Sequence, residues 1–174
     1  MRVTACVAIA AFLLASGGAI AEEKTGDVAA IPQGKAAEAP DAEAFAREAS
    51  LAGLFDVETA QLALDRANDA DVRKLAREIV EEQTLANSRL RAFAPKYART
   101  KLEGDYLARL ERLKQVKADA FDQAFLAIQK ESHDRSVRLF QSYAAGGGDE
   151  MLKSYASESL SFLTLHQTRV NSLR

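Results

Sequence analysis

Apolar side chains recur every three or four residues along most of the chain after residue 41. This is the period of an amphipathic α-helix, because residues three and four positions apart share one helix face. The period-two alternation typical of strands never extends beyond a few positions. The pattern therefore predicts an all-α fold. Long helices are expected at about residues 42–67, 72–94, 121–144 and 150–173, and a shorter one at about 102–113.

Capping and helix-breaking residues divide these helices into two hairpins. Asp41 and Asp149 are suited to cap the first and the last long helix. A short polar turn at residues 68–71 joins the first two long helices, and three glycines at 146–148 separate the last two. The connection over residues 95–117 is much longer and contains the short helix. Two tight hairpins joined by one long crossover predict a ferritin-like four-helix bundle.

The first 21 residues have the layout of a secretory signal peptide. Arg2 precedes an apolar run at residues 7–14, and Ala19-Ile20-Ala21 has the small residues of a cleavage site. We expect cleavage after Ala21, which places the mature protein in the periplasm or outside the cell. The apolar run is shorter than the roughly 20 residues of a membrane-spanning helix, and no later run is longer, so no membrane span is expected in the mature chain.

Residues 22–41 contain two prolines and two glycines without a periodic apolar face, which predicts a flexible tether. The predicted organisation is a signal peptide at 1–21, the tether at 22–41 and the bundle domain at 42–174.

Composition narrows the possible functions. Cys6 is the only cysteine and lies in the predicted signal peptide, so disulfides and thiolate metal sites are not expected in the mature chain. The 23 basic and 25 acidic residues are interleaved along the helices without forming a basic stripe. Nucleic acid is therefore not an expected partner. Glu81 and Glu82 are assigned to a solvated helix face.

The two histidines are the best candidates for chemistry. His133 and His166 both fall on apolar helix stripes, and Glu58 and Gln83 occupy comparable positions on the first two long helices. A four-helix bundle can bring these four side chains, one from each helix, to a shared interior point.

Three interpretations of this cluster stay open. Glu58, His133 and His166 have the donor types of a mononuclear metal site, with Gln83 as a neighbouring polar group. The two imidazoles can instead be neutral core residues hydrogen-bonded to Glu58, Gln83 or a buried water, or they can lie half exposed at an edge of the bundle. Neither histidine follows a glutamate at the three-residue spacing of a di-iron site, so di-iron chemistry is not predicted.

Several segments resemble the bacterial family of exported proteins called domain of unknown function 4142. They are DVETAQLAL, VRKLAREIVEEQTLANSRL, AFDQAFLAIQKESHDRSVRLF and LTLHQTRV, within a resemblance that spans about residues 41–173. The resemblance implies a ferritin-like fold and a histidine in each of the last three long helices. His133 and His166 match two of these histidines, and Gln83 stands where the first is expected.

The leading functional hypothesis is an exported, non-enzymatic bundle without a cofactor, which acts through protein contacts as an envelope or stress-related accessory. Its candidate contact surface for an unidentified envelope protein is an apolar patch of Leu102, Tyr106 and Leu110 on the short helix. Exposure of these side chains would support this hypothesis, and their burial would remove the surface. The alternative is a metal-binding bundle that holds a single transition metal with Glu58, His133 and His166. Self-association into an oligomer is compatible with both.

Overall fold

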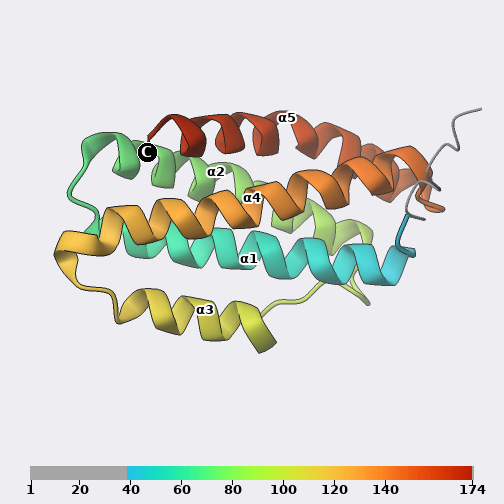
Figure 1. Ribbon diagram of the computed structural model, residues 1–174. Helices are drawn as coiled ribbons and strands as arrows, with labels where there is room; N and C mark the ends of the chain where they lie inside the picture. The colour runs from blue at the N-terminus through green and yellow to red at the C-terminus, as the bar shows by residue number, and fades with distance from the viewer. Residues whose placement is uncertain (1–38, 174) are drawn as a thin grey trace, which may run out of the picture. The chain divides into compact units, whose positions relative to one another are not determined.

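The computed structural model describes residues 39–173, and this part of the chain consists of helices and connecting turns without any strand (Figure 1). The predicted all-α class is confirmed. The predicted signal peptide and nearly all of the predicted tether lie outside the described residues. The helices are α1 (Ala42–Arg66), α2 (Ala70–Phe93), α3 (Gly104–Lys114), the 3₁₀ turn η1 (Ala118–Ala120), α4 (Phe121–Gly146) and α5 (Glu150–Ser172).

Aspartate caps begin three of the long helices. The backbone N–H of Ala44 donates to Asp41 Oδ1 over 2.7 Å, and the N–H of Leu152 donates to Asp149 Oδ1 over 2.9 Å. Both caps were predicted. Asp69 caps α2 in the same way. Each cap satisfies an N–H group that has no partner within its own helix.

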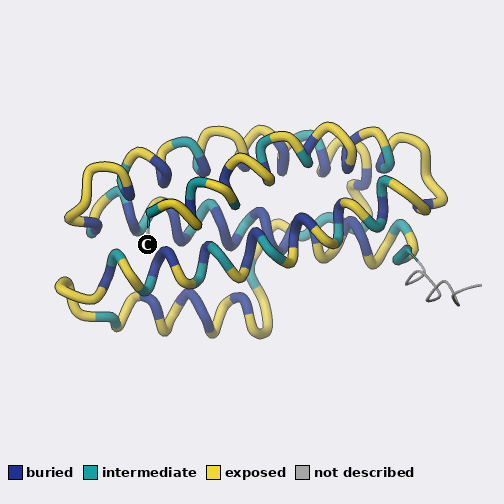
Figure 2. Tube along the Cα trace, turned by 45° about the horizontal axis from the view of Figure 1, so that its top comes forward, coloured by how far each residue is buried: buried dark blue, intermediate teal, exposed yellow. Residues whose placement is uncertain are grey.

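The long helices pack as two antiparallel pairs. The α1–α2 pair and the α4–α5 pair are each joined by a tight turn, and α1 lies against α4 while α2 lies against α5 (Figure 1). The long connection between the pairs carries α3, which packs beside α1. Figure 2 shows the buried residues gathered on the inner sides of these helices.

Two apolar clusters fill the two ends of the bundle. One is built around Phe45, Leu90, Phe140 and Tyr143, and the other around Leu75, Ile79, Phe121 and Phe125. The first contains the C-terminal halves of both α2 and α4, and the second contains their N-terminal halves. Helices α2 and α4 therefore run in the same direction, as the long connection between them allows.

Arg66 secures the connection between α3 and α4. Its guanidinium donates to the carbonyl oxygens of Leu113, Lys114 and Val116, and it lies over the Phe121 ring at 4.5 Å from the ring centre. A residue at the end of α1 thus satisfies the free carbonyls at the end of α3.

The apolar face of α3 is buried, so the candidate contact surface of Leu102, Tyr106 and Leu110 is not exposed. Tyr106 is 9% exposed and Leu110 is 2% exposed, and Leu102 is partly buried against the same cluster. These side chains pack on the face of α1 around Phe55. The sequence correctly indicated an amphipathic helix but did not indicate that α1 offers an apolar surface to cover it.

No helix between residues 39 and 173 combines the length and apolar character that crossing a lipid bilayer requires.

Candidate functional site

A layer of buried polar side chains crosses the middle of the bundle, between the two apolar clusters. We call it the central polar layer. Every member is at most 5% exposed. The members are Asp56 and Thr59 from α1, Gln83 from α2, Gln129, Ser132 and His133 from α4, and His166 from α5.

Asp56 is the buried carboxylate of this layer. Its two oxygens accept hydrogen bonds from Ser132 Oγ at 2.6 Å and from Gln83 Nε2 at 3.2 Å. Burial raises the pKa of Asp56 above its ordinary value, although nearby His133 and the bond from Ser132 act in the opposite direction. Both carboxylate oxygens are therefore already engaged within the layer.

A second group of bonds joins α1 to α4. Gln129 Nε2 donates to Thr59 Oγ1 over 2.7 Å, and Thr59 Oγ1 donates to the carbonyl oxygen of Phe55 over 2.7 Å. Gln129 Oε1 is buried and has no hydrogen-bond partner among the described residues. The layer thus contains acceptors that its own donors do not satisfy.

The tautomer of His133 follows from its surroundings. Its Nδ1 lies 2.9 Å from the carbonyl oxygen of Gln129. A carbonyl oxygen only accepts, so Nδ1 carries a proton, and in the neutral ring Nε2 carries the free lone pair. The side chain is fully buried, and Nε2 meets no hydrogen-bond partner within residues 39–173. A histidine that donates its other N–H to a carbonyl group is typical of metal ligands.

His166 lies against His133 from α5, the other helix of the same hairpin. The two rings meet edge to face with their centres 5.3 Å apart. His166 is 1% exposed, and burial together with His133 lowers its pKa to about 3, so the ring is neutral at pH 7. Its Nε2 lies 2.9 Å from Glu82 Oε2. The contact lacks the direction of a hydrogen bond, and neither ring nitrogen has a hydrogen-bond partner in the described part.

A comparison with protein families assigns the chain to a family. The family model described as "Domain of unknown function (DUF4142)" matches residues 28–173. The chain belongs to the DUF4142 family. No curated protein matches it. A search of solved structures likewise gives no match.

The structure brings together three of the four residues that the sequence singled out in this DUF4142 chain. Gln83, His133 and His166 are all in the central polar layer. Glu58 is only half-buried, and Asp56 occupies the interior position on α1 instead. Two residues correspond to about 200° around a helix, so Asp56 and Glu58 point to nearly opposite sides.

The pattern did contain an indication of Asp56. Buried positions on α1 follow the alternation Ala49, Ala52, Asp56, Thr59, Ala63, which steps by three and four without interruption. Glu58 does not fit this alternation. Sequence reasoning also missed Glu82, which it assigned to a solvated face. The contact of Glu82 with His166 joins α2 to α5, so it leaves no trace in the residue pattern of either helix.

The side chains do not form a complete metal site as they stand. Within residues 39–173, no group of three or more histidine, cysteine, aspartate and glutamate side chains is arranged to hold a metal ion. The two imidazoles supply two nitrogen donors, and a third donor would have to move toward them.

A shallow groove between α2 and α5 lies beside His166. It has a volume of about 100 Å³. It is lined by Glu82, Leu85, Ala86, Arg89, Glu158, Ser159 and Phe162. The Phe162 ring centre is 5.9 Å from that of His166. The groove therefore brings solvent close to the buried imidazole on the side of Glu82.

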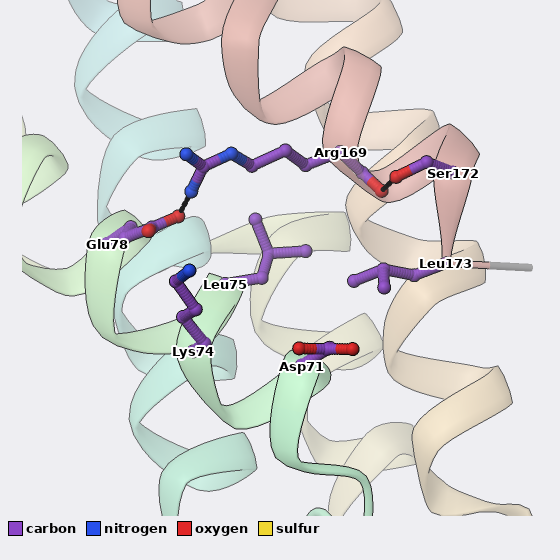
Figure 3. Close-up of a pocket in the computed structure, with 7 residues that line it drawn as sticks. All are labelled: Asp71, Lys74, Leu75, Glu78, Arg169, Ser172 and Leu173. Carbon is purple, nitrogen blue, oxygen red and sulfur yellow. Dashed lines mark hydrogen bonds and ion pairs between the residues drawn. The ribbon is translucent and has the colours of Figure 1, made fainter.

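A larger pocket of about 200 Å³ lies near the start of α2 and the end of α5 (Figure 3). Figure 3 shows Arg169 reaching across to Glu78, with Lys74 and Asp71 among the other residues that line the pocket. The opposite charges offset one another, and no member of the central polar layer lines this pocket. Its size alone does not connect it with the histidines.

Proposed function

We propose that this chain is an exported, ferritin-like helical bundle that binds a single transition-metal ion through His133 and His166. The observation that carries the proposal is the pair of adjacent, buried imidazoles with ring nitrogens that lack partners. Buried polar atoms in proteins are nearly always satisfied, so such nitrogens need an occupant. A metal ion satisfies lone pairs that no protein donor reaches.

The donor set suits a borderline metal. Neutral imidazole is a good ligand for zinc, copper, iron and nickel, and affinity among the divalent ions generally rises toward copper. The contact of His133 Nδ1 with the Gln129 carbonyl oxygen leaves Nε2 as the nitrogen available to a metal, and His166 is neutral at pH 7.

The ferritin-like assignment is supported by the direction of the helices. In a simple up-down-up-down bundle all consecutive helices are antiparallel, whereas here α2 and α4 are parallel and joined by the long connection with α3. Export is supported by the layout of residues 1–21 and is tested by expressing the full-length gene in a Gram-negative bacterium. The expected result is a periplasmic protein that begins at Glu22, and a cytoplasmic, uncleaved product would contradict it.

The protein-contact hypothesis has lost its candidate surface, because Tyr106 and Leu110 are buried between α3 and α1. The alternative that remains is that the two imidazoles only pack, with a buried water between them. These two alternatives differ in their response to metal.

The test uses protein from the full-length gene, purified without an affinity tag and stripped with a chelator. Wild type should bind about one equivalent of copper(II) or zinc and be stabilised by about 2.7 kcal/mol at a free metal concentration of 100 times Kd. His133→Gln and His166→Gln should lose this metal-dependent stabilisation.

Ser132→Ala is the matched control, because it removes a polar group from the same layer without removing a nitrogen donor. It should lower stability equally with and without metal. If wild type takes up none of zinc, copper or iron(II), the metal function is wrong and the histidines are packing residues.

A further inference from the structure

We infer that Glu82 is the third metal ligand, reached from the groove between α2 and α5. The inference rests on the proposed binding by His133 and His166. It replaces Glu58, the carboxylate that the sequence favoured, with a residue of another helix. Its basis is the position of Glu82, which touches a buried imidazole while remaining in contact with solvent.

The contact between Glu82 and His166 has the spacing of two ligands on one ion. Oε2 and Nε2 are 2.9 Å apart without the direction of a hydrogen bond. Two donors at about 2.1 Å from a shared metal, with an angle between about 90° and 110°, are separated by roughly 3.0–3.4 Å. A small outward movement of the carboxylate is enough to admit an ion between the two atoms.

The spacing of the two imidazoles agrees with the same ion. Two rings bound to one tetrahedral metal through nitrogen have their centres about 5 Å apart. The His133 and His166 rings are 5.3 Å apart. The ring spacing is therefore compatible with one shared ion.

Charge also favours Glu82. A divalent cation between two neutral imidazoles needs a nearby anion, because burying an uncompensated charge is costly. Asp56 is the buried carboxylate of the layer, but Ser132 and Gln83 already occupy its oxygens. Glu82 has no such bonds among the described residues and can turn its carboxylate toward the metal.

Glu82 is also placed to receive an ion from solvent. Its side chain is 43% exposed and lines the groove, whereas His166 beneath it is 1% exposed. Phe162 lines another part of the groove, and its ring lies beside the ring of His166. An arriving cation therefore meets a carboxylate before it meets the imidazoles. Because the Glu82 side chain is half-exposed, its rotation disturbs no packed core.

The test is calorimetric titration of the chelator-stripped, full-length-derived protein with zinc and with copper(II). Glu82→Gln should weaken the affinity by at least about 100-fold, because a lost ligand costs more than the 10- to 100-fold typical of outer-shell partners. Glu81→Gln removes the same charge one residue away and should leave the affinity within about threefold, as should Glu58→Gln. Circular dichroism of the metal-free Glu82→Gln protein should match wild type.

A second readout is the electron paramagnetic resonance spectrum of the copper(II) protein. Its hyperfine splitting should change in Glu82→Gln and stay unchanged in Glu81→Gln, since only the former alters the donor set. If wild type binds metal and the Glu82 and Glu81 variants bind equally tightly, Glu82 is not a ligand although the histidine site stands. A large loss in Glu58→Gln instead would return the role to Glu58. If wild type binds no metal, both proposals are wrong.

Discussion

Acidification of the metal-free protein from pH 8 to pH 5 is expected to destabilise it through His166. In the folded chain burial and His133 lower the pKa of His166 from 6.5 to about 3. In the unfolded chain the imidazole is solvated and regains its ordinary pKa. As the pH falls below 6.5, the unfolded state takes up a proton that the folded state does not. Stability is therefore lost progressively between about pH 6.5 and pH 3.

The magnitude follows from the distance between pH 5 and the unfolded pKa. At pH 5, protonation of this one side chain in the unfolded state lowers the free energy of unfolding by about 2 kcal/mol. Two carboxylates facing the site act in the opposite direction. The pKa values of Asp56 and Glu82 are both raised by burial, so their protonation on acidification favours the folded state. The wild-type change alone would mix these contributions.

The assay therefore compares wild type with His166→Gln. Urea unfolding followed by far-ultraviolet circular dichroism gives the free energy of unfolding at pH 8 and pH 5, with chelator present throughout. Wild type should lose about 2 kcal/mol more than the variant over this interval. Ser159→Ala removes a buried, non-titrating polar group from the same helix and should keep the wild-type pH dependence. Equal losses in wild type and His166→Gln would refute the reasoning, because His166 would then be accessible to protons in the folded state.

Three further substitutions test the packing around the site by chemical unfolding. Gly53→Ala should cost about 1–3 kcal/mol, because the added methyl group would overlap the Asn87 side chain, and a simultaneous Asn87→Ala should recover most of the loss. Arg66→Ala should cost about 1–3 kcal/mol by freeing the carbonyls at the end of α3, and Arg66→Lys should not restore it, since one ammonium group cannot replace the guanidinium fork. Asp56→Ala should lower stability by at least about 2 kcal/mol, and by more than Asp56→Asn, because it leaves two buried donors without an acceptor.

The helices could be predicted because each combines a periodic apolar stripe with a clear end. The three- and four-residue steps, the aspartate caps and the glycines after α4 are local features, and the structure confirms them within a few residues. The burial of α3 could not be predicted in the same way. Its stripe of Tyr106 and Leu110 is equally suited to face a partner or another helix of the same chain. The choice depends on the surface of α1, about 50 residues earlier in the chain.

The candidate site shows the same division between local and long-range information. His133 and His166 could be identified because a histidine within an apolar stripe is conspicuous in a chain with two histidines. The carboxylate beside them, Glu82, could not be identified from the sequence. Adjacent residues on a helix point about 100° apart, and only the packing of the helices decides which side chain each one contacts. Gln83 points inward to Asp56 on α1, and Glu82, one position earlier, reaches His166 on α5. A half-exposed glutamate can therefore belong to a buried centre, and such residues are found by measuring contacts between helices rather than by counting positions along one of them.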